Sequence, residues 1–482
     1  MLRHIFVHGV VLFMMATAVT GEDRPVSHGT FDADPQWDGF RNRLLPESLP
    51  IVHQDFGYRR SNFSGGRAAG EIGGTVQRST TPARYSMPIA EKTFDDRLSA
   101  SGTFAVTHAE GGSGVMFGWF NKDSKGWRTS NSLAFRLDGN GGKYWVFYEY
   151  GTRNRRTGGG GAFEGERYQT TPTKPFAGDG TVHRWSLDYD PVAGGGPGLV
   201  TFRIDDRAYE LPVPAEHKAA GAVFNRFGVW NVETGGDKLD VYFDDLIVNG
   251  MRLAFDDDPE WIGEGNSAEF EERIIRPHHD YGFSPTDYAG GQRGEIGGVI
   301  FRDERPSYYG VDVGRLTLDQ PFRADGKIAL RSAGADSGVF LGWFNAAGKR
   351  NKTTPEHEQR QTDFLGVLIE GPSRVGHYFR AAYSTSTGTG GAPMEDPRTQ
   401  EERPVILPDG RVHEWAVHYD PAAGKGRISV TFDGESHALD LTAQDRAAGA
   451  TLDRFGLFNI QAGGHHVEIY CDDLRVTRGE AR

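Results

Sequence analysis

The chain has 482 residues, a net charge of −13 and a single cysteine. The acidic balance disfavours nucleic acid and anionic membrane surfaces as partners, and one cysteine excludes intrachain disulfides. With 66 glycines and 12% aromatic residues, the composition favours a β-rich chain with many turns.

The first 21 residues have the pattern of a secretory signal peptide. Arg3 precedes a mostly apolar run over residues 5–15, and Ala16-Thr17-Ala18 supplies small residues for cleavage. We therefore expect an extracytoplasmic protein, secreted or periplasmic, with a short disordered lead over residues 22–30. Export without disulfides fits a bacterial protein whose cores are stable without covalent links. No other apolar stretch is long enough to span a bilayer, so we expect no membrane insertion.

The chain repeats itself with an offset of 224 residues. The segment that begins at Phe31 returns at Phe255, and Gly70-Glu71-Ile72-Gly73-Gly74 returns as Gly294-Glu295-Ile296-Gly297-Gly298. A period of this length is far too long for a solenoid repeat, so it marks a duplicated whole domain. The repeat predicts one domain over residues 31–250 and a second over residues 251–479, with almost no linker between them.

Short segments of alternating polarity, separated by Gly, Asp and Asn turns, fill each copy. Gly194–Gly198 is expected to turn a hairpin, and Pro214–Ala220 is expected to form one or two helical turns. About ten strands per copy without crossover helices predict an antiparallel β-sandwich. In the first copy the strands are predicted at residues 102–107, 115–121, 132–137, 143–150, 183–189, 199–204, 227–232 and 239–248.

The second half of each copy carries a family resemblance. In the first copy, W-x-L-x-Y-D-P at residues 185–191 is followed by V-T-F-x-I-D at 200–205, by R-F-G-V-W-N at 226–231 and by the Asp244-Asp245 ending. This pattern resembles the C-terminal half of concanavalin A-like lectin/glucanase sandwiches, a group that includes laminin G-like domains. The resemblance implies two tandem jelly-roll sandwiches, each with a concave face that holds glycans in relatives.

Pairs of aspartates open and close each copy. Because the first and last strands of a sandwich are commonly neighbours, we expect these carboxylates to converge, and hard oxygen ligands suit Ca²⁺. The resemblance also implies a structural Ca²⁺ near the final strand. The alternative is that one aspartate of each pair faces solvent while the other hydrogen-bonds a turn. The candidate calcium ligands are Asp32, Asp34, Asp244, Asp245, Asp256, Asp258, Asp472 and Asp473.

Residues retained in both copies supply candidate glycan contacts. Trp119 lies two residues before Asn121, on the same face of a predicted strand. An aromatic ring stacks on the C–H face of a sugar, and an amide binds its hydroxyls. The alternative is structural, with strand tryptophans in the core and a Gly-rich strand packed closely on its neighbour. The candidates are Glu71, Arg78, Tyr85, Trp119 and Asn121, with their counterparts Glu295, Arg302, Tyr309, Trp343 and Asn345.

The copies differ most in the strand at residues 143–150 and in the loop that follows it. Tyrosines and arginines there are placed to bind acidic sugars at the lip of a concave sheet, although a solvated basic strand end is the alternative. In an enzyme, Tyr148 or Tyr150 would act as the base of a lyase, and Arg153 or Arg380 would neutralise a uronate. The paired-carboxylate motif of the glucanase relatives is missing from the sequence.

We interpret the sequence as that of a monomeric polysaccharide-recognition protein with two glycan-binding jelly-roll domains, in which duplication adds avidity. A polysaccharide lyase or glycoside hydrolase on the same scaffold is the first alternative. A non-catalytic adhesion or structural protein of the cell envelope is the second.

Overall fold

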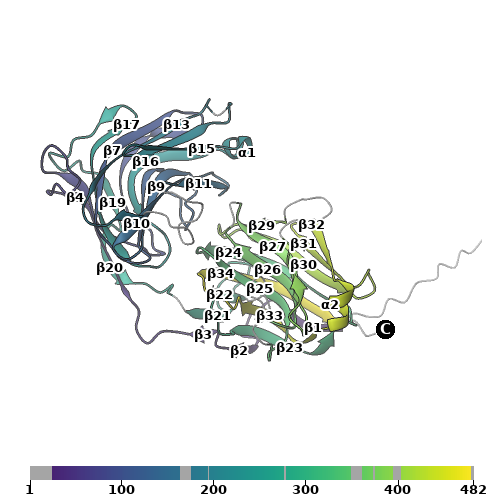
Figure 1. Ribbon diagram of the computed structural model, residues 1–482. Coiled ribbons are helices and arrows are strands. Elements are labelled where there is room, and N and C mark those ends of the chain that lie inside the picture. The colour runs from purple at the N-terminus through teal and green to yellow at the C-terminus, as the bar shows by residue number, and fades with distance from the viewer. Residues whose placement is uncertain are drawn as a thin grey trace, which may run out of the picture.

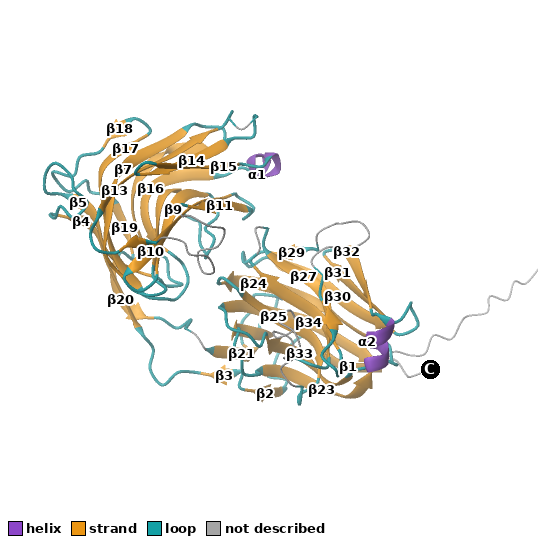
Figure 2. Ribbon diagram, viewed as in Figure 1, coloured by secondary structure: helices purple, strands orange, loops and turns teal. Residues whose placement is uncertain are grey.

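The computed structural model describes residues 24–162, 175–193, 195–275, 278–348, 361–372, 375–393 and 403–478. The predicted signal peptide lies outside these residues. The described chain forms two antiparallel β-sandwiches, shown one above the other in Figures 1 and 2. Its helices are α1 (Ala215–Ala220), at the predicted place, and α2 (Ala443–Ala448). Neither of these short helices is long enough to cross a membrane.

The first sandwich consists of two sheets that enclose one apolar core. The predicted hairpin is confirmed, since β13 and β14 pair antiparallel on either side of the Gly-rich turn. One sheet has the order β15 (Arg207–Pro212), β14 (Leu199–Ile204), β13 (Val182–Asp190), β7 (Leu98–Ala109), β17 (Lys238–Val248), β5 (Glu71–Gln77), β4 (Ile51–Arg59) and β20 (Ser267–Glu271), with β18 (Met251–Arg252) beside β17. The other has the order β11 (Thr157–Gly161), β10 (Lys143–Gly151), β9 (Ser132–Gly139), β8 (Gly114–Phe120), β16 (Val223–Asn231), β6 (Arg84–Thr93) and β19 (Ile262–Glu264), with β12 (Phe176–Ala177) beside β10.

The second sandwich repeats this arrangement around a core of its own. One sheet has the order β3 (Arg43–Leu44), β21 (His279–Ser284), β22 (Glu295–Phe301), β34 (His466–Arg478), β24 (Phe322–Ala333), β30 (Val412–Asp420), β31 (Arg427–Phe432) and β32 (Glu435–Asp440), with β1 (Arg24–Gly29) beside β34. The other has the order β2 (Asp38–Phe40), β23 (Tyr308–Thr317), β33 (Thr451–Asn459), β25 (Ser337–Phe344), β26 (Phe364–Gly371), β27 (His377–Ser384) and β28 (Gly390–Gly391), with β29 (Val405–Ile406) beside β27. The predicted all-β fold of two sandwiches is confirmed.

The N-terminal segment 24–44 belongs to the second sandwich and not to the first. Strand β1 pairs with β34, β2 with β23, and β3 with β21. Phe31 is part of the second core, and Trp37 stacks on Tyr309 with ring centroids 5.8 Å apart. The prediction of a disordered lead over residues 22–30 is wrong for residues 24–29, because β34 extends past the end of β22 and leaves backbone groups for β1 to pair with.

The equivalent segment 251–271 packs in the same way on the first sandwich. Strand β18 pairs with β17, β19 with β6, and β20 with β4. Phe255 and Trp261, the counterparts of Phe31 and Trp37, are buried in the first core. The strand pairing therefore differs from the predicted division at residue 250: residues 51–271 make up the first sandwich, and residues 24–44 with 279–478 make up the second.

The chain consequently passes between the sandwiches twice, once between β3 and β4 and once between β20 and β21 (Figure 1). The carboxylate of Glu272 fixes the second connection to the first sandwich by accepting hydrogen bonds from the hydroxyl of Ser79 (2.8 Å) and the backbone N–H of Thr80 (2.9 Å). Two connections limit relative motion of the sandwiches more than a single linker does.

Candidate functional site

The glutamates of the retained Gly-Glu-Ile-Gly-Gly segment hold loops in place. Glu71 is fully buried and accepts hydrogen bonds from the backbone N–H groups of Phe63 and Ser64, both at 2.8 Å. Glu295 does the same for Tyr288 (2.9 Å) and Ala289 (2.7 Å). The structural alternative therefore describes both glutamates, and neither faces a ligand.

The glycines of this segment are retained for close backbone approach. At Gly73, whose φ is +149°, an added Cβ would lie 2.0 Å from the carbonyl oxygen of Val241 in the neighbouring strand. Gly297 is equally close to the carbonyl oxygen of Ile469, at 2.1 Å. Only a residue without Cβ fits there.

The predicted stacking platform is wrong, because Trp119 and Trp343 are fully buried. Their rings pack on Phe227 and Phe455 in the two cores, with centroids 5.1 and 5.0 Å apart. The amide of Asn121 donates to the carbonyl of Val223 at 3.1 Å, and that of Asn345 to the carbonyl of Thr451 at 3.0 Å. Both tryptophans therefore present no surface on which a sugar could stack. Asn121 is half-buried and lines a cavity of about 470 Å³, described below.

Tyr85 and Tyr309 are also buried, each beneath the opening segment that packs on its sandwich. The hydroxyl of Tyr85 donates to Asp258 at 3.4 Å, and that of Tyr309 to Asp34 at 3.3 Å. Burial, with the added charge of these aspartates, raises the pKa of both tyrosines to about 12. They fix the opening segments and do not reach a cleft.

The candidate lyase tyrosines lie in the core of the first sandwich. Tyr148 stacks on Phe202 with centroids 5.6 Å apart, and burial raises the pKa of its hydroxyl. Tyr150 is 2% exposed, and its hydroxyl lies 2.8 Å from Nδ1 of His217. Because the faces of a strand alternate, burying these tyrosines turns Trp145, Phe147 and Glu149 to the opposite face of β10. The structure thus offers no lyase base at Tyr148 or Tyr150.

Seven of the eight candidate calcium ligands, all but Asp256, have side chains engaged in hydrogen bonds or ion pairs among the described residues. Oδ1 of Asp244 accepts the backbone N–H of Asp245 at 2.6 Å, and Oδ1 of Asp472 accepts that of Asp473 at 2.7 Å. Asp473 also pairs with Lys327 at 2.7 Å. Among the described residues, no group of three or more His, Cys, Asp or Glu side chains is placed to hold a metal ion.

One closing aspartate, Asp244, interacts electrostatically with one opening aspartate, Asp256. Burial raises the pKa of Asp244 to about 6, and Asp245, Glu71 and Asp256 add negative charge around it. Asp256 comes from the segment that opens the second copy, so the meeting of opening and closing aspartates occurs within the first sandwich through this segment.

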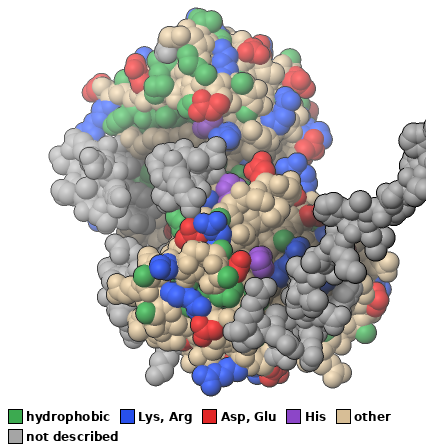
Figure 3. Space-filling view, turned by 90° about the vertical axis from the view of Figure 1, so that its right-hand side faces the viewer, with side chains coloured by type: hydrophobic (Ala, Val, Ile, Leu, Met, Phe, Trp, Pro, Cys, Tyr) green, Lys and Arg blue, Asp and Glu red, His purple; other side chains and the backbone are tan. Residues whose placement is uncertain are grey.

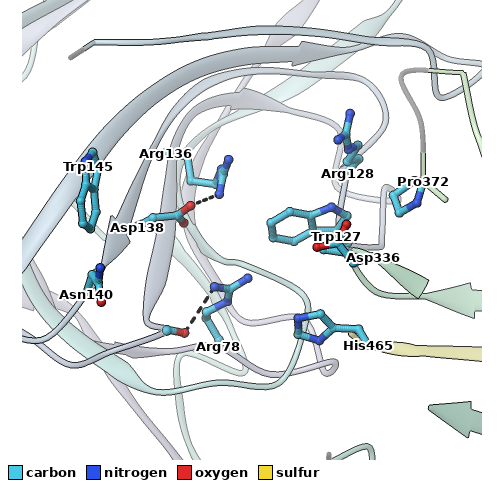
Figure 4. A pocket seen from close by; sticks show the side chains of 13 residues that line it. Arg78, Trp127, Arg128, Arg136, Asp138, Asn140, Trp145, Asp336, Pro372 and His465 are labelled. Carbon is cyan, nitrogen blue, oxygen red and sulfur yellow. Dashed lines mark hydrogen bonds and ion pairs between the residues drawn. The ribbon is translucent and has the colours of Figure 1, made fainter. Parts of the chain in front are cut away.

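The described structure places a cavity of about 430 Å³ between the two sandwiches, which we call the cleft. The first sandwich contributes three arginines, Arg78, Arg128 and Arg136, together with Trp127, Asp138, Asn140 and Trp145 (Figure 4). The second contributes Ala335, Asp336, Pro372 and His465. Gly112 and Asp336 occupy equivalent positions in the two copies, so equivalent loops face each other across the cleft. Of the residues predicted to bind glycan, Arg78 alone lines it.

Trp127 orders two of the arginines. The guanidinium of Arg78 lies 5.3 Å and that of Arg136 lies 5.2 Å from its ring centroid, within cation–π range. Arg136 also pairs with Asp138 and lies 3.6 Å from Glu149. Arg78 donates to the carbonyl oxygen of Gly112 at 3.3 Å. The cleft wall therefore holds preorganised cationic donors beside a carboxylate.

A buried ion pair positions the loop that carries Trp127. Arg84, on β6, donates to the carbonyl oxygens of Lys122 and Ser124, and its guanidinium lies 3.4 Å from Glu233. Glu233 in turn accepts the backbone N–H of Gly126, next to Trp127. Burial raises the pKa of Glu233 to about 7, against the opposing effect of Arg84.

Two further cavities adjoin the interface. One, of about 410 Å³, shares Arg78, Gly112 and His465 with the cleft. The other, of about 470 Å³, is lined by Lys125, Arg153, Arg155 and Arg331 against the acids Asp123 and Asp409. In Figure 3, Lys and Arg side chains interspersed with acids lie along the boundary between the lobes.

The equivalent place in the second sandwich is filled by its own side chains. Glu370 lies 3.7 Å from Arg302, the counterpart of Arg78, and also pairs with Arg380. Both arginines are buried, and burial lowers the pKa of Arg380. Arg380 is thus engaged in an ion pair with Glu370 inside the second sandwich.

The sequence contains a signal for one of the cleft residues. The alternation in β10 separates Trp145 from Tyr148 and Tyr150, and the structure shows that the face with the tyrosines meets the core. Trp127, Arg136, Asp138 and Asn140 belong to no repeated motif, since Leu368 and Glu370 are the counterparts of Arg136 and Asp138. The contributions of Asp336 and His465 depend on how the two sandwiches meet.

No family model and no curated protein matches the chain. The comparison with solved structures gives matches of low similarity. Domains LG4-5 of the mouse laminin α1 chain are 14% identical over 86% of this chain and 92% of theirs, with a TM-score of 0.24. An exolytic alginate lyase from Zobellia galactanivorans is 11% identical over 42% of this chain and 89% of its own, with a TM-score of 0.28. A lectin from Bauhinia forficata in complex with GalNAc is 10% identical over 43% of this chain and 96% of its own, with a TM-score of 0.25. These similarities assign no ligand.

Proposed function

We propose that this protein binds polysaccharide, outside the cytoplasm, at one composite site in the cleft between its two sandwiches. The observation that carries the proposal is the lining of the cleft, where Trp127 and Trp145 lie beside Arg78, Asp138 and Asn140. Aromatic rings with amide, carboxylate and guanidinium groups supply the apolar contacts, donors and acceptors that a polyhydroxylated ligand requires. The signal-peptide pattern of the N-terminal sequence supports the location.

Details of the cleft favour a ligand with many hydroxyl groups. Asp138 lines the cleft, and its Oδ1 is buried without a hydrogen-bond partner among the described residues. A buried acceptor without a partner is costly, so a hydroxyl that donates to it gains binding energy. Asn140 is exposed beside it and offers both a donor and an acceptor.

A composite site changes the expected stoichiometry. Two independent concave sites would bind two oligosaccharides per chain, whereas one cleft formed by both sandwiches binds one. The enzyme alternatives have less support, because Tyr148 and Tyr150 lie in the core.

The test is binding of a panel of neutral and acidic polysaccharides to the full chain, by affinity electrophoresis, and titration calorimetry with an oligosaccharide of the best ligand. We expect one oligosaccharide per chain and a loss of affinity of about tenfold in Asn140→Ala, the size of one or two lost hydrogen bonds. Arg203→Gln, an exposed change on β14 away from the cleft lining, is the matched control and should bind as the wild type does. Failure of every polysaccharide to bind, or release of unsaturated or reducing sugars, would overturn the proposal.

A further inference from the structure

A cluster of ion pairs in the second sandwich corresponds in position to part of the cleft wall in the first. In the second, the carboxylate of Glu370 lies between two buried arginines, Arg302 at 3.7 Å and Arg380 in direct contact. Two arginines around one carboxylate form a strong, charge-assisted recognition unit. This unit is made entirely from the chain itself.

Strand register identifies the corresponding place in the first sandwich. Asp138 is opposite Gly114 as Glu370 is opposite Gly338, which makes Asp138 the counterpart of Glu370. Arg78 is the counterpart of Arg302, and each arginine packs against an equivalent glycine, Gly236 or Gly464.

The first sandwich differs in two side chains: Asp138 is one methylene group shorter than Glu370, and Arg136 stands where the second sandwich has Leu368. The shorter Asp138 pairs with Arg136 on its own strand, where Glu370 reaches Arg302. Arg78 instead lies on the cleft wall beside Trp127. Arg78, the counterpart of the arginine that Glu370 approaches, thus lines the cleft in the first sandwich.

We propose that Arg78 binds a carboxylate of the glycan ligand, in the place where Glu370 lies in the second sandwich. The ligand is accordingly a uronate-containing polysaccharide. This inference rests on the proposed function, and it adds the class of ligand.

The surroundings of Arg78 support an anionic ligand on a protein whose net charge is −13. Arg128 lines the same cleft, and its positive charge adds to burial in lowering the pKa of His377 to about 3. Beyond it, Lys125, Arg153, Arg155 and Arg331 line the neighbouring cavity, where further acidic units of an extended chain would lie. Cationic donors therefore follow the interface in spite of the acidic protein.

The experiment compares polyuronates with their carboxyl-reduced, neutral counterparts and with a sulfated galactan, all bound to the full chain. We expect binding of at least one polyuronate, a loss of about 10- to 100-fold on carboxyl reduction, and weaker binding as salt is raised. A neutral glycan that binds as tightly would overturn the ligand class while leaving the proposed function in place, and so would preference for the sulfated galactan. Absence of binding to every glycan would overturn both.

Two opposite changes at Asp138 test the site itself. In Asp138→Glu the longer side chain reaches Arg78 as Glu370 reaches Arg302, so polyuronate affinity should fall about tenfold or more. In Asp138→Asn the side chain keeps an oxygen that can accept from a ligand hydroxyl but loses the negative charge beside Arg78, so polyuronate affinity should be retained or rise. Equal effects of the two substitutions would contradict the inference, and unchanged melting temperatures confirm that both variants are folded. Arg78→Gln should lower polyuronate affinity as carboxyl reduction does, with Arg203→Gln as the control.

Discussion

Arg84 and Glu233 form an ion pair of 3.4 Å beneath the loop that carries Trp127, with side chains only 4% and 2% exposed. In the second copy Tyr308 and Gln461 stand at the equivalent positions, so the first copy alone has this pair. A buried pair of charges is a costly way to hold a loop, because desolvation opposes the mutual attraction. The ion pair occurs in the sandwich whose loop lines the cleft, and we therefore infer that it holds Trp127 in position.

Titration of Glu233 should be visible in protein stability. Its pKa of about 7 in the folded chain exceeds the ordinary value of 4.5, so between these values the folded state holds the proton more tightly than the unfolded state. The free energy of unfolding contributed by this group therefore falls as pH rises through that window, by about 2 kcal/mol between pH 5.5 and 7.5. Urea unfolding of the wild type and of Glu233→Gln should differ by this slope. Parallel pH profiles for the two proteins would show that Glu233 does not titrate there.

Replacing the buried aspartate in the middle of β17 or of β34 should stabilise the protein at neutral pH. Burial raises the pKa of Asp244 and of Asp472 to about 6. At pH 7.5 both are ionised, and each buried carboxylate lowers the free energy of unfolding. Asp244→Asn and Asp472→Asn should each raise the free energy of unfolding by about 1 kcal/mol at pH 7.5, and the gain should shrink towards pH 4, where the carboxyls are protonated. A bound Ca²⁺ predicts the reverse: both variants would be less stable, and added Ca²⁺ would raise the melting temperature of the wild type alone.

The exchange of opening segments can be tested with a matched pair of tryptophans. Trp37→Ala should destabilise the second sandwich and Trp261→Ala the first, each by roughly 2–4 kcal/mol, since each removes a large ring from the sandwich on which its segment packs. Hydrogen exchange should accelerate in β22 and β23 for the first variant and in β5 and β6 for the second. The opposite assignment would show that each opening segment packs on its own copy.

The core tryptophans should affect stability and leave binding unchanged. Trp119→Phe and Trp343→Phe retain an aromatic ring in the core but lose volume, and we expect a loss of about 1–3 kcal/mol in each. Polysaccharide affinity should not change in either variant under conditions where both are folded. Trp127→Phe, at the cleft, should weaken binding instead, because it alters the ring that orders Arg78 and Arg136. Equal binding losses in all three would argue against the cleft as the site.

Repetition and alternation in the sequence determined the scaffold. The 224-residue offset specifies two copies of one domain. The period-two strands and the Gly-rich turns specify an antiparallel sandwich for each, since these two patterns are local and reflect backbone geometry and burial. The repeat also identified residues that both copies need, and these proved to be structural: Glu71 and Glu295 hold loops, while Trp119 and Trp343 fill cores. These residues are retained in both copies because the fold requires them.

Only the tertiary structure decided where the cleft lies. Segment 24–44 packs on a sandwich whose sequence begins more than 200 residues later, and no local pattern encodes such a pairing. The face of β10 that meets the core is fixed by the sheet opposite, which buries Tyr148 and turns Trp145 to the cleft. The meeting of Arg78 with His465 depends on the packing of two whole domains, a property of their surfaces rather than of any segment of the sequence.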